Sequence, residues 1–417
     1  MKNAVPNFTP ILLGSDFNVY GMARSFYELN GKPVRAIAQK RLAPTRYSKI
    51  VDLTFIPDFS EDPAWINAMR KLKQEYANHP EPVLLIGCSD GYAELIAKHK
   101  DELEDVFVCP YVDYQLLKQL NDKENFYRLC EKYDLPYPGT KIISRADYQQ
   151  NQIDQPFGYP VAVKPANSVE WVDIQFEGRK KAFIIHDEVE YRSVIGKIFD
   201  NGYKSDVIVQ DFIPGDDSRM RVVNAYVDQY HHVKMMNLGH PLLEDPAPGA
   251  IGNYVAILPE YNEAIYQQLK QFLEQLNYVG YADFDLKWDE RDQTYKVFEI
   301  NLRQGRSSFY VTLNGCNLAQ YLVEDYVTDS LKDRPIVLGN HDPKNWKLWL
   351  GVSKRTFEEY AHDNREKELA VELIQQGQYG NTFWYNKDEN PMRWLLWKWM
   401  DHKYAQNFAK YFHLEKG

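Results

Sequence analysis

Two segments near residue 290 carry the side chains best suited to metal chemistry. Residues 281–287 and 295–301 alternate apolar and polar side chains, and the polar residues between them predict a turn, so we expect an antiparallel hairpin. Pairing about the middle of that turn places Asp285 opposite Glu299, with Asn301 on the same face. Facing carboxylates repel unless a cation lies between them, and Mg²⁺ prefers hard oxygen ligands. The hairpin therefore favours a magnesium site over the alternative of a charged, solvent-exposed turn.

Basic side chains suited to phosphate binding accompany this hairpin. Arg303 and Arg306 follow it directly, Lys164 stands near the end of the apolar run 159–165, and Lys123 begins a predicted helix. An ammonium group at the end of a strand can present a point charge to a phosphate. Lys123 or Lys164 taken alone is more typical of a solvated surface residue. Phosphate binding is therefore predicted only from the two lysines together with the acidic hairpin and the arginines.

The segment 207–217 is suited to reading a nucleotide. An apolar strand bends at Pro214 and Gly215, which frees backbone N–H and C=O groups to meet the edge of a base. Asp217 follows where a carboxylate can accept hydrogen bonds from the ribose hydroxyls. A strand that simply ends in a turn explains this segment equally well when it is considered alone.

In their order along the chain, these segments resemble the ATP-grasp superfamily. Within it, four runs are similar to the D-aspartate ligases, which are carboxylate–amine ligases, and the likeness covers nearly the whole chain. The four runs are residues 42–50, 210–218, 239–246 and 301–308.

The resemblance implies a role for each candidate residue and two cofactors, ATP and Mg²⁺, with two ions expected and Mn²⁺ as an alternative. The implied groups are, for the phosphates, Lys123 and Lys164; for adenine and ribose, Gln210, Asp211, Phe212, Ile213 and Asp217; for the metal, Asp285, Glu299 and Asn301; and for catalysis, Arg303, Arg306 and Lys164.

Two departures from the superfamily pattern stand out. The phosphate-covering loop of many members is glycine-rich, whereas residues 165–181 contain only Gly178. Some members carry an arginine two positions before the metal aspartate, where this chain has Asp283. Both departures bear on which groups stabilise the phosphates, including Arg221.

The resemblance also implies a reaction. The β-carboxylate of D-aspartate would attack ATP to form an acyl phosphate, which the ε-amine of L-lysine in a nucleotide- or lipid-linked peptidoglycan precursor would then open. Closure of the 165–181 loop would keep water from the acyl phosphate. An ATP-grasp ligase for another amino acid or dipeptide is the nearest alternative.

The elements that must position these groups divide the chain into three expected domains. Residues 1–115 predict a parallel α/β substrate-side domain, because strand and helix patterns alternate there. Its strands are expected at 11–14, 33–38, 50–55, 83–87 and 106–112, and its helices at 20–29 and 63–76. The ATP-grasp domain is expected at 116–330, with a lid at 116–205 and a metal-binding part at 206–330, and a helical extension at 331–417.

Substrate groups are expected in the loops that follow the strands of the first domain, because ligands bind at the carboxyl ends of parallel strands. D-Aspartate carries one ammonium and two carboxylates and so needs both acidic and basic partners. The candidates are Asp16, Asn18, Arg24, Arg46, Ser89, Asp90 and, from the ATP-grasp domain, His240.

Two other classes of function remain open. Residues 87–91 match the G-x-S-x-G pattern of a hydrolase nucleophile elbow, with Ser89 as the nucleophile. This interpretation leaves the acidic hairpin unexplained. A non-catalytic nucleotide-binding module is the other alternative, although no expected metal ligand or phosphate lysine is missing.

Composition narrows the class of protein. The 417 residues are 44% hydrophobic, which predicts two or three globular domains, and 49 Lys and Arg against 59 Asp and Glu give a net charge of −10. An acidic chain is a poor match for a nucleic-acid partner. Four scattered cysteines, no signal-like start and no apolar run near the ~20 residues of a span predict a cytoplasmic protein with no membrane span.

The tail from Pro391 onward combines tryptophans with basic residues. A helix that packs its tryptophans on the preceding domain is the favoured interpretation. A peripheral membrane contact through aromatic and basic side chains is the alternative.

Overall fold

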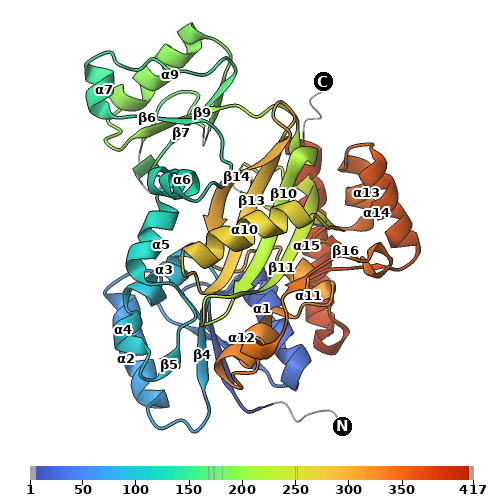
Figure 1. Ribbon diagram of the computed structural model, residues 1–417. Helices are drawn as coiled ribbons and strands as arrows, with labels where there is room; N and C mark the ends of the chain where they lie inside the picture. The colour runs from blue at the N-terminus through green and yellow to red at the C-terminus, as the bar shows by residue number, and fades with distance from the viewer. Residues whose placement is uncertain are drawn as a thin grey trace. The chain divides into compact units, whose positions relative to one another are not determined.

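The computed structural model describes residues 6–167, 170–171, 174–180, 182–248, 250 and 252–412. The predicted closing loop at 165–181 therefore falls partly outside the described residues. Contacts divide the chain into two compact units (Figure 1). One unit contains the chain up to 117 together with 216–285 and 300 onward, and the other contains 118–215 and 286–299.

The first unit begins with the predicted parallel sheet, whose strand order is β3-β2-β1-β4-β5. The strands are β1 (Thr9–Leu13), β2 (Val34–Ala38), β3 (Val51–Phe55), β4 (Val83–Gly87) and β5 (Phe107–Val108). The helices between them are α1 (Phe17–Asn30), α2 (Ala64–Tyr76), α3 (Asp90–Lys98) and α4 (Lys100–Leu103), with α5 (Tyr114–Asn121) next in the chain.

The last strand of this sheet is shorter than predicted. The sequence predicts a strand over 106–112, but β5 contains only Phe107 and Val108. Pro110 has no backbone N–H and cannot continue a ladder, which explains the early end. Strand order reverses between β1 and β4, so the loops that follow these two strands flank the crevice where such sheets bind ligands.

A larger sheet follows in the order β14-β13-β10-β11-β12-β16-β17, with β15 paired to β11. Its strands are β10 (Met220–Val227), β11 (Val233–Glu244), β12 (Tyr254–Glu260), β13 (Gly280–Asp289), β14 (Thr294–Asn301), β15 (Val337–Leu338), β16 (Leu348–Leu350) and β17 (Tyr379–Gly380). The helices beside it are α10 (Glu263–Gln275), α11 (Phe309–Leu313) and α12 (Leu318–Tyr326).

One hydrophobic core joins the two sheets of this unit. It contains Leu12 of β1, Phe26 of α1, Tyr226 of β10, Tyr310 of α11 and Leu322 of α12, and each of these side chains is fully buried. Burial of apolar surface contributes about 25 cal/mol per Å² to the free energy of folding. Because such cores are close-packed, the elements that carry the candidate site are held rigidly.

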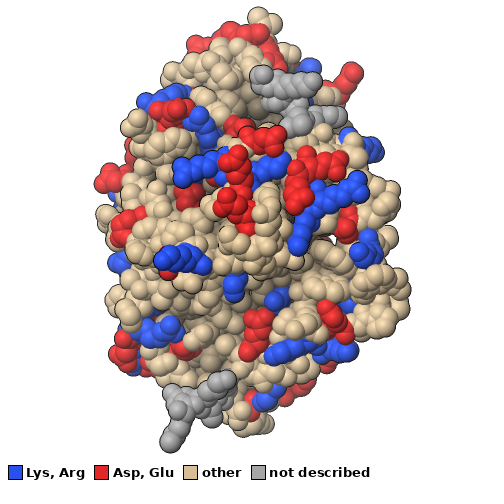
Figure 2. Space-filling model, turned by 90° about the vertical axis from the view of Figure 1, so that its right-hand side faces the viewer, with Lys and Arg blue, Asp and Glu red and all other residues tan. Residues whose placement is uncertain are grey.

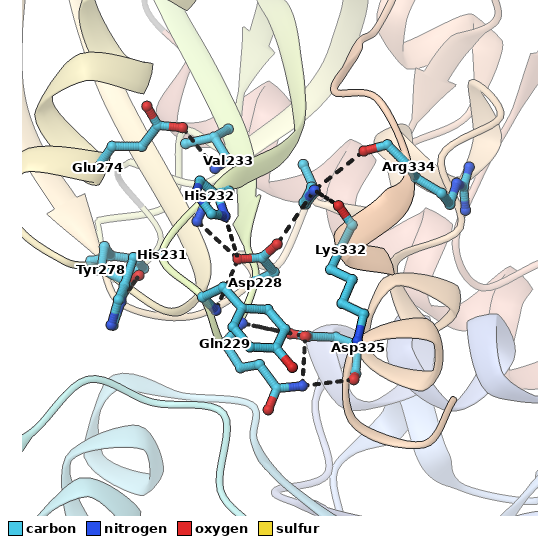
Figure 3. Close-up of polar contacts among 12 residues, drawn as sticks. Asp228, Gln229, His231, His232, Val233, Glu274, Tyr278, Asp325, Lys332 and Arg334 are labelled. Carbon is cyan, nitrogen blue, oxygen red and sulfur yellow. Dashed lines mark hydrogen bonds and ion pairs between the residues drawn. The ribbon is translucent and has the colours of Figure 1, made fainter. Parts of the chain in front are cut away.

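A buried polar cluster lies where the β10–β11 hairpin meets α12 (Figure 3). Asp228 is fully buried, and its carboxylate accepts hydrogen bonds from the backbone of Tyr230 (3.0 Å) and His232 (2.8 Å). The Lys234 ammonium lies 3.5 Å from that carboxylate and donates to the carbonyl of Lys332 (2.7 Å).

Asp325 of α12 completes the cluster. Its carboxylate accepts hydrogen bonds from the Tyr226 hydroxyl (2.8 Å) and from the backbone and side-chain amides of Gln229 (3.1 Å each). Burial, reinforced by the charge of Asp228, raises the pKa of Asp325 to about 6.

The second unit is built on an antiparallel sheet in the order β6-β9-β7-β8. The strands are β6 (Thr140–Ile143), β7 (Val161–Pro165), β8 (Phe183–Ile185) and β9 (Val207–Asp211), and the helices are α6 (Lys123–Lys132), α7 (Arg145–Gln149) and α9 (Glu188–Asp200). Aliphatic residues of β7, β8 and β9 pack with α9 in a separate core.

The C-terminal region contains α13 (Lys354–Tyr360), α14 (Arg365–Gln375) and the long helix α15 (Pro391–Tyr411), besides the short strands β15 to β17. Buried Arg393 anchors the start of α15 through an ion pair with buried Asp388 (3.2 Å). Within the part of the chain that the structure describes, no helix is both long and apolar enough to cross a membrane. Figure 2 shows one face on which basic and acidic side chains are interspersed.

Candidate active site

The loops after β1, β4 and β14 converge in the first unit. The strand order of the parallel sheet predicts this for the loops after β1 and β4. Asn18, in the first turn of α1, donates from Nδ2 to the carbonyl of Cys88 (3.1 Å) and to the carbonyl of Gln304 (2.6 Å). The loops after β1, β4 and β14 are thereby held at one place. We call residues 302–308 the arginine loop, because it contains Arg303 and Arg306.

Arg303 is fixed by a bidentate ion pair with Asp90. Its Nε and Nη2 lie 2.8 and 3.0 Å from the two carboxylate oxygens. Burial by itself would lower the pKa of Arg303, but the negative charges of Asp90, Asp283 and Asp16 outweigh burial and raise it. A pre-positioned cation therefore stands at this point, and Asp90 orients it.

Arg306 is held by the C-terminal helix. Its Nη2 donates to the hydroxyl of Tyr404 in α15 (2.6 Å), and its guanidinium lies 5.1 Å from the centre of the Phe17 ring. Burial raises the pKa of the Tyr404 hydroxyl, while the Arg306 charge opposes the rise. Tyr404 was not a predicted site residue, and nothing in its local sequence points to a partner 98 residues away.

Asp16 is the N-cap of α1 and accepts hydrogen bonds from the backbone of Asn18 (3.1 Å) and Val19 (3.2 Å). Burial raises its pKa, against these hydrogen bonds and the charges of Arg306 and Arg303. Asp16 is thus close enough to both arginines to share their electrostatic environment.

Asp283, which stands where some superfamily members have an arginine, supports the arginine loop. It accepts a hydrogen bond from Asn224 Nδ2 (2.8 Å). A Cβ atom on Gly305 would lie 2.4 Å from the Asp283 carboxylate, so a larger residue would displace that side chain. Ser308 accepts from the Gly305 N–H (2.6 Å) and donates to Asn224, which closes the network.

In the second unit, the two predicted phosphate lysines lie beside the end of β14. The Lys123 ammonium is 3.9 Å from the Glu299 carboxylate, and the Lys164 ammonium is 5.6 Å from the centre of the neighbouring Phe298 ring. A hydrogen bond from the Tyr127 hydroxyl to the Phe298 carbonyl (2.9 Å) holds this strand against α6. Lys123 is therefore paired with Glu299, and Lys164 lies beside the preceding residue of the same strand.

The predicted adenine segment is held by side chains of the β13–β14 hairpin. Arg291 forms a bidentate ion pair with Asp211 (3.0 and 2.7 Å), and Lys287 donates to the carbonyl of Gly215 (2.6 Å). Lys287 also lies 5.3 Å from the centre of the Phe212 ring. Gln210 is buried, and its Nε2 donates to the Thr140 hydroxyl (2.9 Å).

The oxygen donors expected for the metal lie on the paired strands β13 and β14. Asp283 and Asp285 alternate with buried Phe284 and Leu286 along β13, as predicted. Asn301 is the last residue of β14, and its Nδ2 is 3.5 Å from the Asp283 carbonyl.

Carboxylate and amide oxygens are the donor types that a hard divalent cation prefers. Burial raises the pKa of Tyr254, and the charges of Asp285, Glu244, Asp217 and Asp283 raise it further, so the surroundings of this hydroxyl are negatively charged. Among the described residues, no three His, Cys, Asp or Glu side chains converge as a metal site by themselves. An ion held by Asp285, Glu299 and Asn301 would take its remaining ligands from phosphate and water.

His240 and Asp217 flank the start of β10. His240 contacts the Ser218 carbonyl (2.6 Å) and lies 3.4 Å from Glu260, which also pairs with Arg221 (2.7 Å). These contacts fix the turn that presents Asp217. Asp217 lines a cavity of about 360 Å³ in the same unit.

Three substrate candidates have other partners. Arg24 donates to the carbonyls of Asn381 and Thr382 (2.7 and 3.0 Å), and Arg46 donates to the carbonyl of Arg41. Ser89 caps α3 in an extended conformation (φ −154°, ψ 162°), without the strained turn of a nucleophile elbow.

Comparison with known proteins identifies the family. No family model matches the chain. A D-aspartate ligase of Enterococcus faecium is 55% identical over the whole of both chains. An L-amino acid ligase from Bacillus licheniformis has a TM-score of 0.56 at 16% identity, covering 80% of this chain and 78% of its own. A biotin carboxylase domain from Hydrogenobacter thermophilus, solved with MgADP, has a TM-score of 0.58 at 11% identity, covering 82% and 73%.

The two structural likenesses confirm the predicted ATP-grasp fold with its N-terminal parallel sheet. The full-length identity of more than half with the enterococcal enzyme confirms the predicted family. The chain belongs to the D-aspartate ligase family of ATP-grasp carboxylate–amine ligases.

Proposed function

We propose that this protein joins the β-carboxylate of D-aspartate to the ε-amine of L-lysine in a peptidoglycan precursor, with ATP converted to ADP and phosphate. The identity of 55% with a D-aspartate ligase over both full lengths carries the proposal. A solved structural neighbour binds MgADP, which supports ATP and Mg²⁺ as the cofactors here.

The chemistry needs an activated carboxylate, because oxide is too poor a leaving group for an amine to displace. A β-carboxylate oxygen bonds to the γ-phosphorus of ATP as the bond to the bridging oxygen breaks, which gives an acyl phosphate and ADP. The ε-amine then forms the C–N bond, and phosphate leaves with the electrons of the C–O bond. No covalent enzyme intermediate is required.

The chain's own groups supply positioned positive charge. We assign Arg303, oriented by Asp90, and Arg306, oriented by Tyr404, to neutralise the transferring phosphoryl group. Mg²⁺ held by the hairpin oxygens would add neutralising charge at the phosphates.

The lysines and the substrate loops complete the proposed roles. We assign Lys123 and Lys164 to the α- and β-phosphates, because Lys123 pairs with Glu299 and Lys164 lies beside Phe298 of the same strand. Asp16 and Asn18, in the crevice between β1 and β4, are the best-placed groups for the substrate amino acid. We place the reaction in the cytoplasm, which agrees with four buried cysteines that form no disulfide.

The test is phosphate release from Mg·ATP with D-aspartate, L-aspartate or D-alanine, each with and without a UDP-linked muramyl pentapeptide that contains L-lysine. We expect release that needs both D-aspartate and the pentapeptide, and mass spectrometry should show one added aspartyl unit. Release with another amino acid would keep the ligase chemistry and change the donor. ATP-independent ester hydrolysis that is lost in Ser89→Ala would instead support the hydrolase alternative.

A further inference from the structure

The exposed hydrophobic side chains of this protein are not scattered. Of the twelve large hydrophobic residues that are exposed among those the structure describes, seven come from two short stretches, 42–47 and 384–399. They are Leu42, Tyr47, Trp384, Met392, Trp394, Leu395 and Trp399. A contiguous group of this kind marks an interaction surface, whereas single exposed residues do not.

Hydrogen bonds hold the two stretches together as one surface. Asn390 Nδ2 donates to the carbonyl of Tyr47 (2.8 Å), and the buried Arg393 donates to the carbonyls of Pro44 (3.1 Å) and Arg46 (3.0 Å). We call the exposed side chains of residues 40–49 and 384–403 the aromatic–basic face.

Packing explains only part of the tryptophan content of α15. Trp397 stacks on Phe383, with ring centres 5.8 Å apart. Trp394 and Trp399 remain 48% and 53% exposed on the same helix. The favoured interpretation of the sequence, that the helix packs its tryptophans on the preceding domain, therefore holds for one tryptophan and leaves two facing outward.

The charge of this face is opposite to that of the whole chain. Its exposed basic residues outnumber its exposed acidic residues by seven to one, a local balance of +6 in a chain of net −10. Lys398 and Lys403 lie over the rings of Trp394 and Trp399, at 5.7 and 5.9 Å from the ring centres. The basic residues are Lys40, Arg41, Arg46, Lys49, Lys387, Lys398 and Lys403, and the acidic one is Glu389.

We propose that the aromatic–basic face rests on the surface of an anionic lipid bilayer, with the first half of α15 lying in the plane of the interface. Tryptophan and leucine side chains enter the headgroup boundary, while lysine ammonium groups extend to the phosphates. A second copy of the chain is a poor partner for this face, because two faces with a local charge of +6 each would repel one another. This inference is independent of the proposed substrate.

The test is vesicle flotation of the full chain, without nucleotide or substrate, on vesicles of phosphatidylglycerol with phosphatidylcholine and on phosphatidylcholine alone. We expect binding to the anionic vesicles only, weakened by salt. Each lysine near an anionic surface contributes about fivefold to binding, so Lys398→Gln with Lys403→Gln should weaken it about thirtyfold. Lys344→Gln with Lys347→Gln, an exposed pair elsewhere in the C-terminal region, is the matched control and should bind as the wild type does.

The aromatic arm uses Trp394→Ser with Trp399→Ser, compared with Phe55→Ser and Val189→Ser, whose side chains are at least 47% exposed elsewhere. We expect the tryptophan variant alone to lose vesicle binding by about tenfold or more, with an unchanged melting temperature. Absence of wild-type flotation, or equal binding by the tryptophan variant and its control, would overturn the proposal. So would a dimer in sedimentation that the tryptophan variant abolishes, because the face would then be an interface between copies.

Discussion

At the scale of single residues, the site depends on side chains that hold the arginines in place. Arg303 and Arg306 carry the charge, but Asp90 and Tyr404 fix their directions. Such preorganisation lowers the cost of stabilising charge that develops during the reaction. If Arg303 and Arg306 act as we propose, Asp90 and Tyr404 are positioning residues, and their loss should affect turnover more than binding.

We predict that Tyr404→Phe lowers kcat about tenfold while the KM for ATP changes little, since the variant loses one hydrogen bond to Arg306 and keeps the ring. Steady-state kinetics and a melting curve check this. Tyr360→Phe, whose ring packs 5.0 Å from that of Phe408, is the control and should retain wild-type kinetics. A KM effect without a kcat effect would contradict the positioning role.

Glu299→Gln should lower turnover by at least about a hundredfold, because it removes the carboxylate that we propose as a metal ligand and that pairs with Lys123. Glu290→Gln, in the turn of the same hairpin, should have little effect. Turnover is measured across Mg²⁺ concentrations, with circular dichroism to check the fold. Full activity of Glu299→Gln at ordinary Mg²⁺ would show that the hairpin does not hold the ion.

At the scale of elements, the buried acid on α12 makes stability depend on pH. The folded pKa of Asp325 is about 6 against an ordinary value of 3.8, so the folded protein keeps a proton that the unfolded chain releases between these values. The free energy of unfolding therefore falls as pH rises from about 4 to 6, by roughly 3 kcal/mol at most.

Asp325→Asn should flatten this part of the stability curve, because the amide does not titrate. Urea unfolding at pH 4, 5, 6 and 7 measures the slope directly. The Asp329→Asn variant changes an exposed carboxyl whose pKa is lowered by Lys332, so it should keep the wild-type slope over this range. Equal slopes in Asp325→Asn and the wild type would contradict the assignment.

The anchor of α15 is the second prediction at this scale. Arg393→Met should cost about 3–5 kcal/mol, because it leaves the buried Asp388 carboxylate without its cation. Chemical unfolding measures the loss, and Arg355→Met, in an exposed pair on α13, should change stability by less than about 1 kcal/mol. If Arg393→Met also changed stability by less than about 1 kcal/mol, α15 would be held by its hydrophobic contacts and not by this ion pair.

At the scale of the whole molecule, the local sequence pattern predicted strands better than it predicted contacts between residues far apart in the chain. Alternation predicted β13 and β14, and apolar runs predicted β1 to β4, because period and turn residues are local signals. The early end of β5 was not predicted, because the apolar pattern takes no account of the missing N–H of Pro110.

Long-range pairs were beyond any such pattern. Asp90 and Arg303 are 213 positions apart, and Arg306 meets Tyr404 across 98. No spacing rule connects such residues, so their partners emerge only when the loops are folded together. The ordered set of lysines, carboxylates and arginines predicted the family and its fold, because the family resemblance supplied what periodicity lacks.

The proposed ligase reaction requires that the β-carboxylate of D-aspartate is activated by phosphoryl transfer. The most direct measurement uses D-aspartate labelled with ¹⁸O in the β-carboxylate, with ATP, Mg²⁺ and the lysine-containing pentapeptide, followed by mass spectrometry of the released phosphate. An acyl phosphate intermediate requires one labelled oxygen in each phosphate formed, and α-carboxylate label should transfer none. Phosphate without ¹⁸O from the β-carboxylate would contradict the account.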